Sequence, residues 1–183
     1  KLRKELDIPD DKIIVASVGR VVIRKGHEYV IRAIKKIKDP AFVFVIIGSG
    51  KYLRYYEEQC AEEIRQRRLF LLGNRTDVYE LLKDSDIFLF TTLNENHSMA
   101  LLEAINMRCA AIVTNVGGNT ETIQDGKSGI VIRPENTDDI IHSLYLMKDK
   151  SVRYKYSEAA YNYAKKHFSV QNTLGKLEKI FDE

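Results

Sequence analysis

Short runs of hydrophobic residues recur along the chain and alternate with amphipathic stretches. The runs are apolar at consecutive positions and rich in β-branched or aromatic side chains. They cover residues 13–18, 42–47, 69–72, 87–91, 110–114 and 129–133. Strands that are apolar on both faces are typical of a parallel sheet covered by helices on each side. Between the runs, apolar residues recur at helical spacing, as at Val30, Ile31, Ile34 and Ile37. This alternation predicts an α/β domain with a doubly wound, mainly parallel six-stranded sheet, followed by C-terminal helices over residues 137–183.

Composition narrows the class of protein. With 183 residues, 44% of them hydrophobic, the chain is long enough to bury the core of one domain. The formal net charge is only +3, from 29 basic and 26 acidic side chains, which argues against a nucleic-acid partner. Cys60 and Cys109 lie in apolar segments, so we expect buried thiols in a reducing compartment. The sequence has no secretory signal and no run long enough to span a membrane, and it therefore predicts a soluble, cytoplasmic protein.

The loops that follow the predicted strands are the places where a ligand is expected. In a doubly wound sheet, ligands bind at the carboxyl ends of the strands. The relevant loops are residues 19–26, 48–51, 73–76, 92–98 and 115–119. Four of the five contain glycine at or near the strand end, where the absence of a side chain lets a ligand approach the backbone. The four histidines are scattered without ligand spacing, so no metal site is expected.

The first of these loops carries two cations. Arg20 follows the first strand, and Lys25 and Gly26 come just before a helix. An arginine and a lysine that converge at a helix N-terminus can clamp a diphosphate. Taken alone, the simpler interpretation is that both are solvated surface cations.

The fourth loop and its helix add the complementary chemistry. Ser98 can cap the helix, and the amides of Asn96, His97 and Ser98 then lie near its positive end. Glu103 lies within the same helix, where a carboxylate would repel phosphate and is better suited to a hydroxyl group. Because burial is costly for an unpaired charge, we expect Glu103 to be substantially buried and hydrogen-bonded. Glu95, at the strand end, suits a second hydroxyl-bearing group. Cations for phosphate and carboxylates for sugars together describe a nucleotide sugar.

At this point the sequence resembles a known family. VGRVVIRKG (residues 18–26), IIGSG (46–50), the stretch 70–90, ENHSMALLE (95–103) and VGGNTETIQDGKSGIVI (116–132) are similar, in order, to the motifs of the retaining group 1 (family 4) glycosyltransferases. The resemblance is to their C-terminal, donor-binding domain, and it covers nearly the whole chain. It implies one Rossmann-like half of a GT-B fold.

The resemblance also implies roles for individual residues. Arg20 and Lys25 would bind the donor diphosphate and steady the leaving group, Glu103 would hold the ribose, and Glu95 would contact the transferred sugar. The segment 73–75 would border the nucleobase, mainly through its backbone. The other donor-binding positions are Gly19, Gly50, Asn74, Arg75, Asn96, His97 and Ser98. The donor would be of the UDP or GDP type, and the sugar would be transferred with retention of configuration. No cofactor and no metal would be needed, because fixed cations neutralise the diphosphate.

Two features depart from the family pattern. The family often has Gly-Phe-Gly after the first glutamate, where this chain has Asn96, His97 and Ser98, and this leaves open whether activity is preserved. A complete enzyme of this fold is also about twice as long. We therefore expect residues 1–183 to be one donor-binding domain, with residues 1–11 as a linker from an N-terminal acceptor domain that this sequence lacks. That domain would be its partner. The fragment alone would be inactive, and the full enzyme could associate peripherally with the cytoplasmic face of a membrane.

Two alternatives belong to other classes of protein. One is a nucleotide-sugar-binding module without transfer activity, in which the altered loop marks lost catalysis. The other is a small α/β interaction domain of the response-regulator type. The latter would need acidic residues at the end of the first strand, and residues 18–20, Val-Gly-Arg, provide none.

Overall fold

A computed structural model describes residues 1–168 of the chain. Its centre is a single sheet of six parallel strands, in the spatial order β3-β2-β1-β4-β5-β6. The strands are β1 (Ile13–Val18), β2 (Phe42–Ile47), β3 (Leu69–Leu71), β4 (Ile87–Phe90), β5 (Ala110–Thr114) and β6 (Ile130–Ile132). The strand order reverses between β1 and β4, and the crevice at such a reversal is where ligands bind in this fold. The predicted sheet is confirmed.

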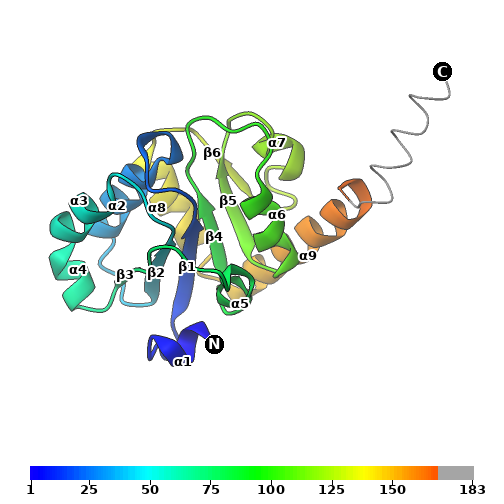
Figure 1. Ribbon diagram of the computed structural model, residues 1–183. Helices are drawn as coiled ribbons and strands as arrows, with labels where there is room; N and C mark the ends of the chain where they lie inside the picture. Colours follow the sequence, from blue (N-terminus) through cyan, green and yellow to red (C-terminus); the bar gives the residue numbers. More distant parts are fainter. Residues whose placement is uncertain (169–183) are drawn as a thin grey trace, which may run out of the picture.

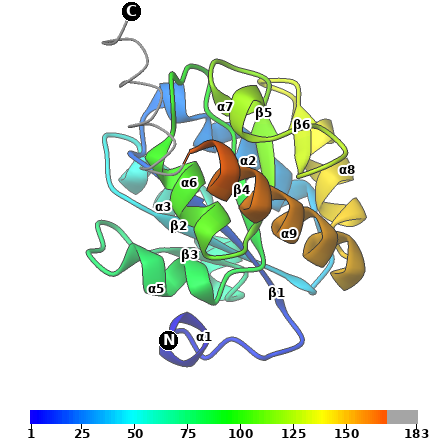
Figure 2. The ribbon, with the colours of Figure 1, turned by 90° about the vertical axis from the view of Figure 1, so that its right-hand side faces the viewer.

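Helices cover both faces of this sheet (Figures 1 and 2). They are α1 (Leu2–Glu5), the 3-10 helix η1 (Ile23–Lys25), α2 (His27–Lys36), α3 (Leu53–Gln59), α4 (Ala61–Arg65), α5 (Val78–Lys83), α6 (Met99–Asn106), α7 (Asn119–Thr122), α8 (Thr137–Leu146) and α9 (Lys150–His167). One layer contains α2, α3 and α8, and the other contains α1, α5, α6 and α9. Figure 1 shows α1 at the bottom, before β1 begins, and α7 at the top, where β5 ends.

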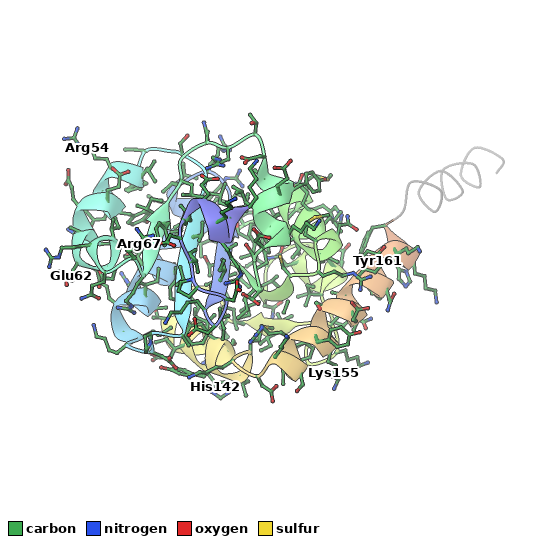
Figure 3. All side chains as sticks on the ribbon, turned by 90° about the horizontal axis from the view of Figure 1, so that it is seen from below. Arg54, Glu62, Arg67, His142, Lys155 and Tyr161 are labelled. Atoms are coloured by element: carbon green, nitrogen blue, oxygen red, sulfur yellow. The ribbon has the colours of Figure 1, made fainter. Side chains whose placement is uncertain are left out.

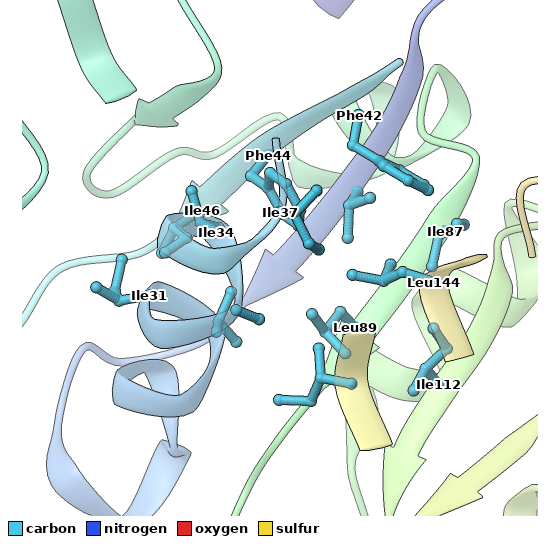
Figure 4. Close-up of a cluster of buried hydrophobic side chains, with 14 of the residues drawn as sticks. Ile31, Ile34, Ile37, Phe42, Phe44, Ile46, Ile87, Leu89, Ile112 and Leu144 are labelled. Atoms are coloured by element: carbon cyan, nitrogen blue, oxygen red, sulfur yellow. The ribbon is translucent and has the colours of Figure 1, made fainter. Parts of the chain in front are cut away.

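The two layers are held by alternate residues of each strand. In β2, Phe42 and Phe44 face the layer that contains α2 and α8, where they meet Leu144 (Figure 4). Val43 and Val45 face the opposite layer, which contains α1 and α5. All five side chains are at most 5% exposed, and full burial of a side chain of this size contributes about 1.5–3 kcal/mol. Burial on both faces is the physical reason that nearly every strand position is apolar.

Helices lie at both ends of the described chain. Helix α1 packs on the domain, because Leu2 is fully buried and Arg3 donates a 2.8 Å hydrogen bond to Asp86. Of the predicted C-terminal helices, α8 and α9 are present, and residues 169–183 lie outside the described residues. Cys60 and Cys109 are fully buried free thiols, as expected. Within residues 1–168, no helix has the length and apolar character needed to cross a membrane.

Candidate functional site

Glycines bring the first two strand-end loops into direct backbone contact. A Cβ built on Gly48 would lie 2.1 Å from the carbonyl oxygen of Gly19, and one built on Gly50 would lie 2.4 Å from that of Val21. Contacts this short to backbone atoms exclude any larger residue. The turn is closed by Val21 N–H, which donates a 2.9 Å hydrogen bond to the carbonyl of Ser49. The predicted donor-binding positions Gly19 and Gly50 are therefore neighbours at the carboxyl ends of β1 and β2.

Lys25 and Glu95, predicted to bind different parts of a donor, form an ion pair with each other. Lys25 Nζ donates a hydrogen bond to the carboxylate of Glu95. Their side chains are only 13% and 14% exposed, and the ammonium group also lies over the ring of Phe90, 5.0 Å from its centroid. The aliphatic part of Lys25 passes beside Gly19, where a Cβ would lie 3.7 Å from Cδ. The structure therefore places Lys25 and Glu95 together, next to Gly19.

Backbone acceptors in the first loop hold this arrangement in place. The carbonyl of Arg24 accepts from Leu93 N–H at 2.7 Å and from the Thr92 hydroxyl at 3.1 Å. The carbonyl of Gly26 accepts from the Thr91 hydroxyl at 3.0 Å. Both threonines are almost completely buried. Loops from β1 and β4, the two strands at the reversal point, are thus joined by hydrogen bonds between side chain and backbone.

Arg20 is the exposed cation of the site. Its guanidinium makes no hydrogen bond or ion pair with other described residues, and it borders a hollow of about 200 Å³ at the ends of β1, β2 and β3. Asn74 and Arg75 line the same hollow, and Asn74 Oδ1 accepts a 2.9 Å hydrogen bond from the Ser49 hydroxyl. This hollow collects residues from three of the predicted loops.

The guanidinium of Arg75 is already engaged. It donates two hydrogen bonds to the Asp77 carboxylate, both 2.8 Å, and two to Glu5 in α1, at 2.6 and 3.0 Å. Hydrogen bonds with both carboxylates raise the pKa of Arg75 above its usual range. The nucleobase role of segment 73–75, through its backbone, stays a prediction.

The N-terminus of α6 is built as the sequence predicts. The Ser98 hydroxyl accepts a 3.2 Å hydrogen bond from Leu101 N–H and caps the helix. The side chains of Asn96 and His97 are exposed, and the His97 ring lies 5.2 Å from the ring of Phe168, centroid to centroid. His97 therefore packs on an aromatic ring that follows α9.

Glu103 departs from expectation in its hydrogen bonding. It lies in the second turn of α6 and is half-buried, and burial raises the pKa of its carboxyl group. Its carboxylate makes no hydrogen bond or ion pair with any residue in the described part of the chain. The expected burial is present in part, but the expected partner is not. One turn away from Glu103 lie Met99, Ala100, Asn106 and Met107, and the one polar side chain among them, Asn106, is exposed and does not bond to it.

The loop after β5 contributes two glycines, Gly117 and Gly118, to which the sequence alone assigned no role. A Cβ on Gly117 would lie 1.6 Å from the carbonyl oxygen of Glu95, and one on Gly118 would lie 2.0 Å from that of Asn96. Gly118 N–H also donates a 2.9 Å hydrogen bond to the Asn96 carbonyl. These two glycines support the backbone of the Glu95 loop. The available signal was a Gly-Gly pair two residues after a buried strand.

His27 is a second residue without an assigned role. It is 2% exposed at the start of α2, and neither ring nitrogen has a hydrogen-bond partner among the described residues. Burial, together with the positive charge of Lys25, lowers its pKa to about 4. His27 is therefore a neutral imidazole beneath the site.

The sequence and the fold of the chain match known proteins. A sequence model of the family described as "Glycosyl transferases group 1" matches residues 1–167. The chain belongs to this family. It is 28% identical, over 183 residues, to the Escherichia coli protein named UDP-Gal:alpha-D-GlcNAc-diphosphoundecaprenol alpha-1,3-galactosyltransferase. The alignment covers 97% of this chain and 47% of that protein, so the group 1 chain spans about half the length of such a relative.

Two solved structures share the fold. The chain matches Anabaena HepE in complex with UDP with a TM-score of 0.89 at 19% identity, covering 99% of this chain and 51% of that one. It matches the C-terminal domain of the group 1 protein LpcC from Francisella tularensis with a TM-score of 0.80 at 24% identity, covering 91% of both chains. The expected Rossmann-like half of a GT-B fold is confirmed.

Proposed function

We propose that the chain binds a nucleoside diphosphate-sugar and forms the donor half of a retaining hexosyltransferase. One observation carries this proposal. Arg20 and Lys25 come from the loop after β1 and Glu95 from the loop after β4, yet they lie at one strand edge, beside the reversal between β1 and β4. This is the position where the doubly wound fold binds nucleotides. A solved relative in complex with UDP and a curated relative named for UDP-Gal support this choice of ligand class.

Each group would act on a different part of the donor. Arg20 and Lys25 provide positive charge for the diphosphate, and the capped N-terminus of α6 adds the positive end of its dipole. The carboxylate of Glu103, which has no polar partner within residues 1–168, would accept hydrogen bonds from the ribose hydroxyls, and Glu95 would meet the transferred sugar. Fixed cations aimed at the leaving group stabilise the charge that develops on it as the glycosidic bond breaks. The proposed site uses no divalent metal and no cofactor.

Retention of configuration requires that the new bond forms on the same face as the old one breaks. In this proposal the C1–O bond to the diphosphate breaks through an oxocarbenium-like state, and the acceptor oxygen bonds to C1 on that face. The acceptor proton leaves with the diphosphate. Catalysis requires both reactants to be held in place, and an N-terminal domain of the same protein would hold the acceptor. Residues 1–183 alone should therefore bind donor without transferring sugar.

Titration with UDP, GDP and ADP, followed by NMR, tests this function. At least one diphosphate should shift the amides of residues 19–26, 48–51 and 95–98, and a chelator should not alter the shifts. Lys25→Met should weaken binding by about tenfold to about 150-fold, since a hydrogen bond to a charged group contributes about 1.5–3 kcal/mol. Shifts confined to other loops, or binding that requires a divalent cation, would refute the proposed site. Sugar transfer by these 183 residues would refute the need for a further domain that holds the acceptor.

A further inference from the structure

The ion pair between Lys25 and Glu95 joins two groups that the proposed function assigns to different parts of the donor. Lys25 is assigned to the diphosphate and Glu95 to the sugar. In the structure, the two charges neutralise each other, and the side chains of Lys25 and Glu95 are only 13% and 14% exposed. The following inference rests on the proposed function and concerns the same site.

The loops do not need this pair to hold their shape. The hydrogen bonds from Leu93 and Thr92 to the Arg24 carbonyl tie the first loop to the end of β4. On the other side, Gly117 packs against the carbonyl oxygen of Glu95. The backbone positions of both loops are therefore fixed by contacts that do not involve the Glu95 carboxylate. A variant that loses only this negative charge should keep the fold.

The pair does change the charge that a ligand meets. Arg20 is exposed and has no polar partner among residues 1–168, whereas the positive charge of Lys25 is cancelled by Glu95. A diphosphate that approaches Lys25 must compete with a carboxylate for the same ammonium group. A sugar attached to the diphosphate would offer hydroxyl donors to that carboxylate, while a bare diphosphate offers none.

We propose that Glu95 determines specificity by competing with the diphosphate for Lys25, so that the site binds a nucleotide sugar in preference to the bare nucleoside diphosphate. When a donor binds, Lys25 exchanges its carboxylate partner for phosphate, and Glu95 takes sugar hydroxyls as partners. After transfer the sugar is gone, Glu95 returns to Lys25, and the diphosphate is released. Removing the negative charge of Glu95 should therefore tighten binding of the bare diphosphate.

The size of the effect follows from Coulomb's law. A carboxylate and a phosphate that contact the same ammonium group from opposite sides are about 6 Å apart. One unit charge at that distance changes binding by about threefold in an effective dielectric of ~80 and by about a hundredfold at ~20. For a partly buried pair we expect Glu95→Gln to tighten nucleoside diphosphate binding by roughly tenfold. The gain should shrink with added salt, because salt screens the interaction.

Isothermal titration of the 183-residue chain tests the inference. The ligands are UDP and GDP with UDP-glucose and GDP-mannose, measured on the wild type and on Glu95→Gln. Glu95→Ala is a second variant that also removes the charge. Glu58→Gln is the matched control, since it removes the same charge from an ion pair with Arg54 on the exposed side of α3, which Figure 3 shows from below. Thermal melts establish that each variant is folded.

Both Glu95 variants should bind the bare diphosphate more tightly, and the preference for the sugar-bearing ligand should fall. Glu58→Gln should bind like the wild type. Unchanged or weaker diphosphate binding by a folded Glu95→Gln would overturn the competition while leaving the proposed function standing. Equal tightening by Glu58→Gln would assign the effect to net charge and would also overturn it. A wild-type chain that binds none of the four ligands would overturn both the inference and the proposed function.

Discussion

Gly117→Ala is the smallest change that should disturb the candidate site through its backbone. Gly117 has a φ of +47°, and an added Cβ would lie 1.6 Å from the carbonyl oxygen of Glu95. Because the added Cβ and the carbonyl oxygen are both fixed to the backbone, no side-chain rotation can relieve this contact. The loop that carries Glu95 must therefore move. We expect this movement to shift the loop that carries Glu95, so that the carboxylate no longer meets the transferred sugar, and to weaken binding of a nucleotide sugar.

Two terms set the loss of stability. Alanine in the left-handed region costs about 1–2 kcal/mol, and overpacking in a filled region costs about 1–3 kcal/mol. The free energy of unfolding should therefore fall by about 2–5 kcal/mol. In a domain of this size each kcal/mol lowers the melting temperature by roughly 2–4 °C.

Gly126→Ala is the matched control. Gly126 has a φ of +68°, but an added Cβ would have no atom within 4 Å. Only the backbone term applies there, so its unfolding free energy should fall by about 1–2 kcal/mol and its ligand binding should not change. Urea unfolding and nucleotide sugar titration of both variants separate backbone strain from the contact with the Glu95 loop. Equal losses of stability with unchanged binding in both would refute the role of Gly117 as a support for Glu95.

Two further predictions concern titratable groups at the site. Burial raises the pKa of Glu103, so stability should fall as the pH rises from the ordinary pKa of a glutamate through this raised pKa. Glu103→Gln should therefore be at least as stable as the wild type at pH 7 in urea unfolding, yet should bind nucleoside diphosphate more weakly. Unchanged affinity would refute the ribose role. The pKa of His27 is lowered to about 4 in the folded protein. As the pH falls from 7 to 5, the unfolded chain therefore takes up a proton that the folded chain does not, and the free energy of unfolding should fall by about 2 kcal/mol. His27→Gln should reduce this dependence of the unfolding free energy on pH, whereas His142→Gln, at an exposed position, should not. Equal slopes in the wild type and both variants would contradict the prediction.

The contrast between Ser98 and Glu103 shows which features of the site were readable from sequence. The cap at Ser98 depends on residues within one turn of a helix, and the structure contains it as predicted. Glu103 was expected to have a hydrogen-bond partner, but a partner must come from a neighbouring element, and none of the described residues supplies one. Arg75 shows the same limit, because its carboxylate partner Glu5 lies seventy positions earlier, in α1.

The sequence by itself determined the strands, the parallel sheet and the loops that carry the candidate chemistry. These features follow from local regularities, since burial on both faces requires consecutive apolar residues and strand ends require glycine or polar residues. Only the tertiary structure decided that Lys25 pairs with Glu95 and that Gly117 supports Glu95. Those contacts join segments that no local pattern relates. They exist because the strand order brings the ends of β1, β4 and β5 to one edge, where side-chain packing fixes which charges meet.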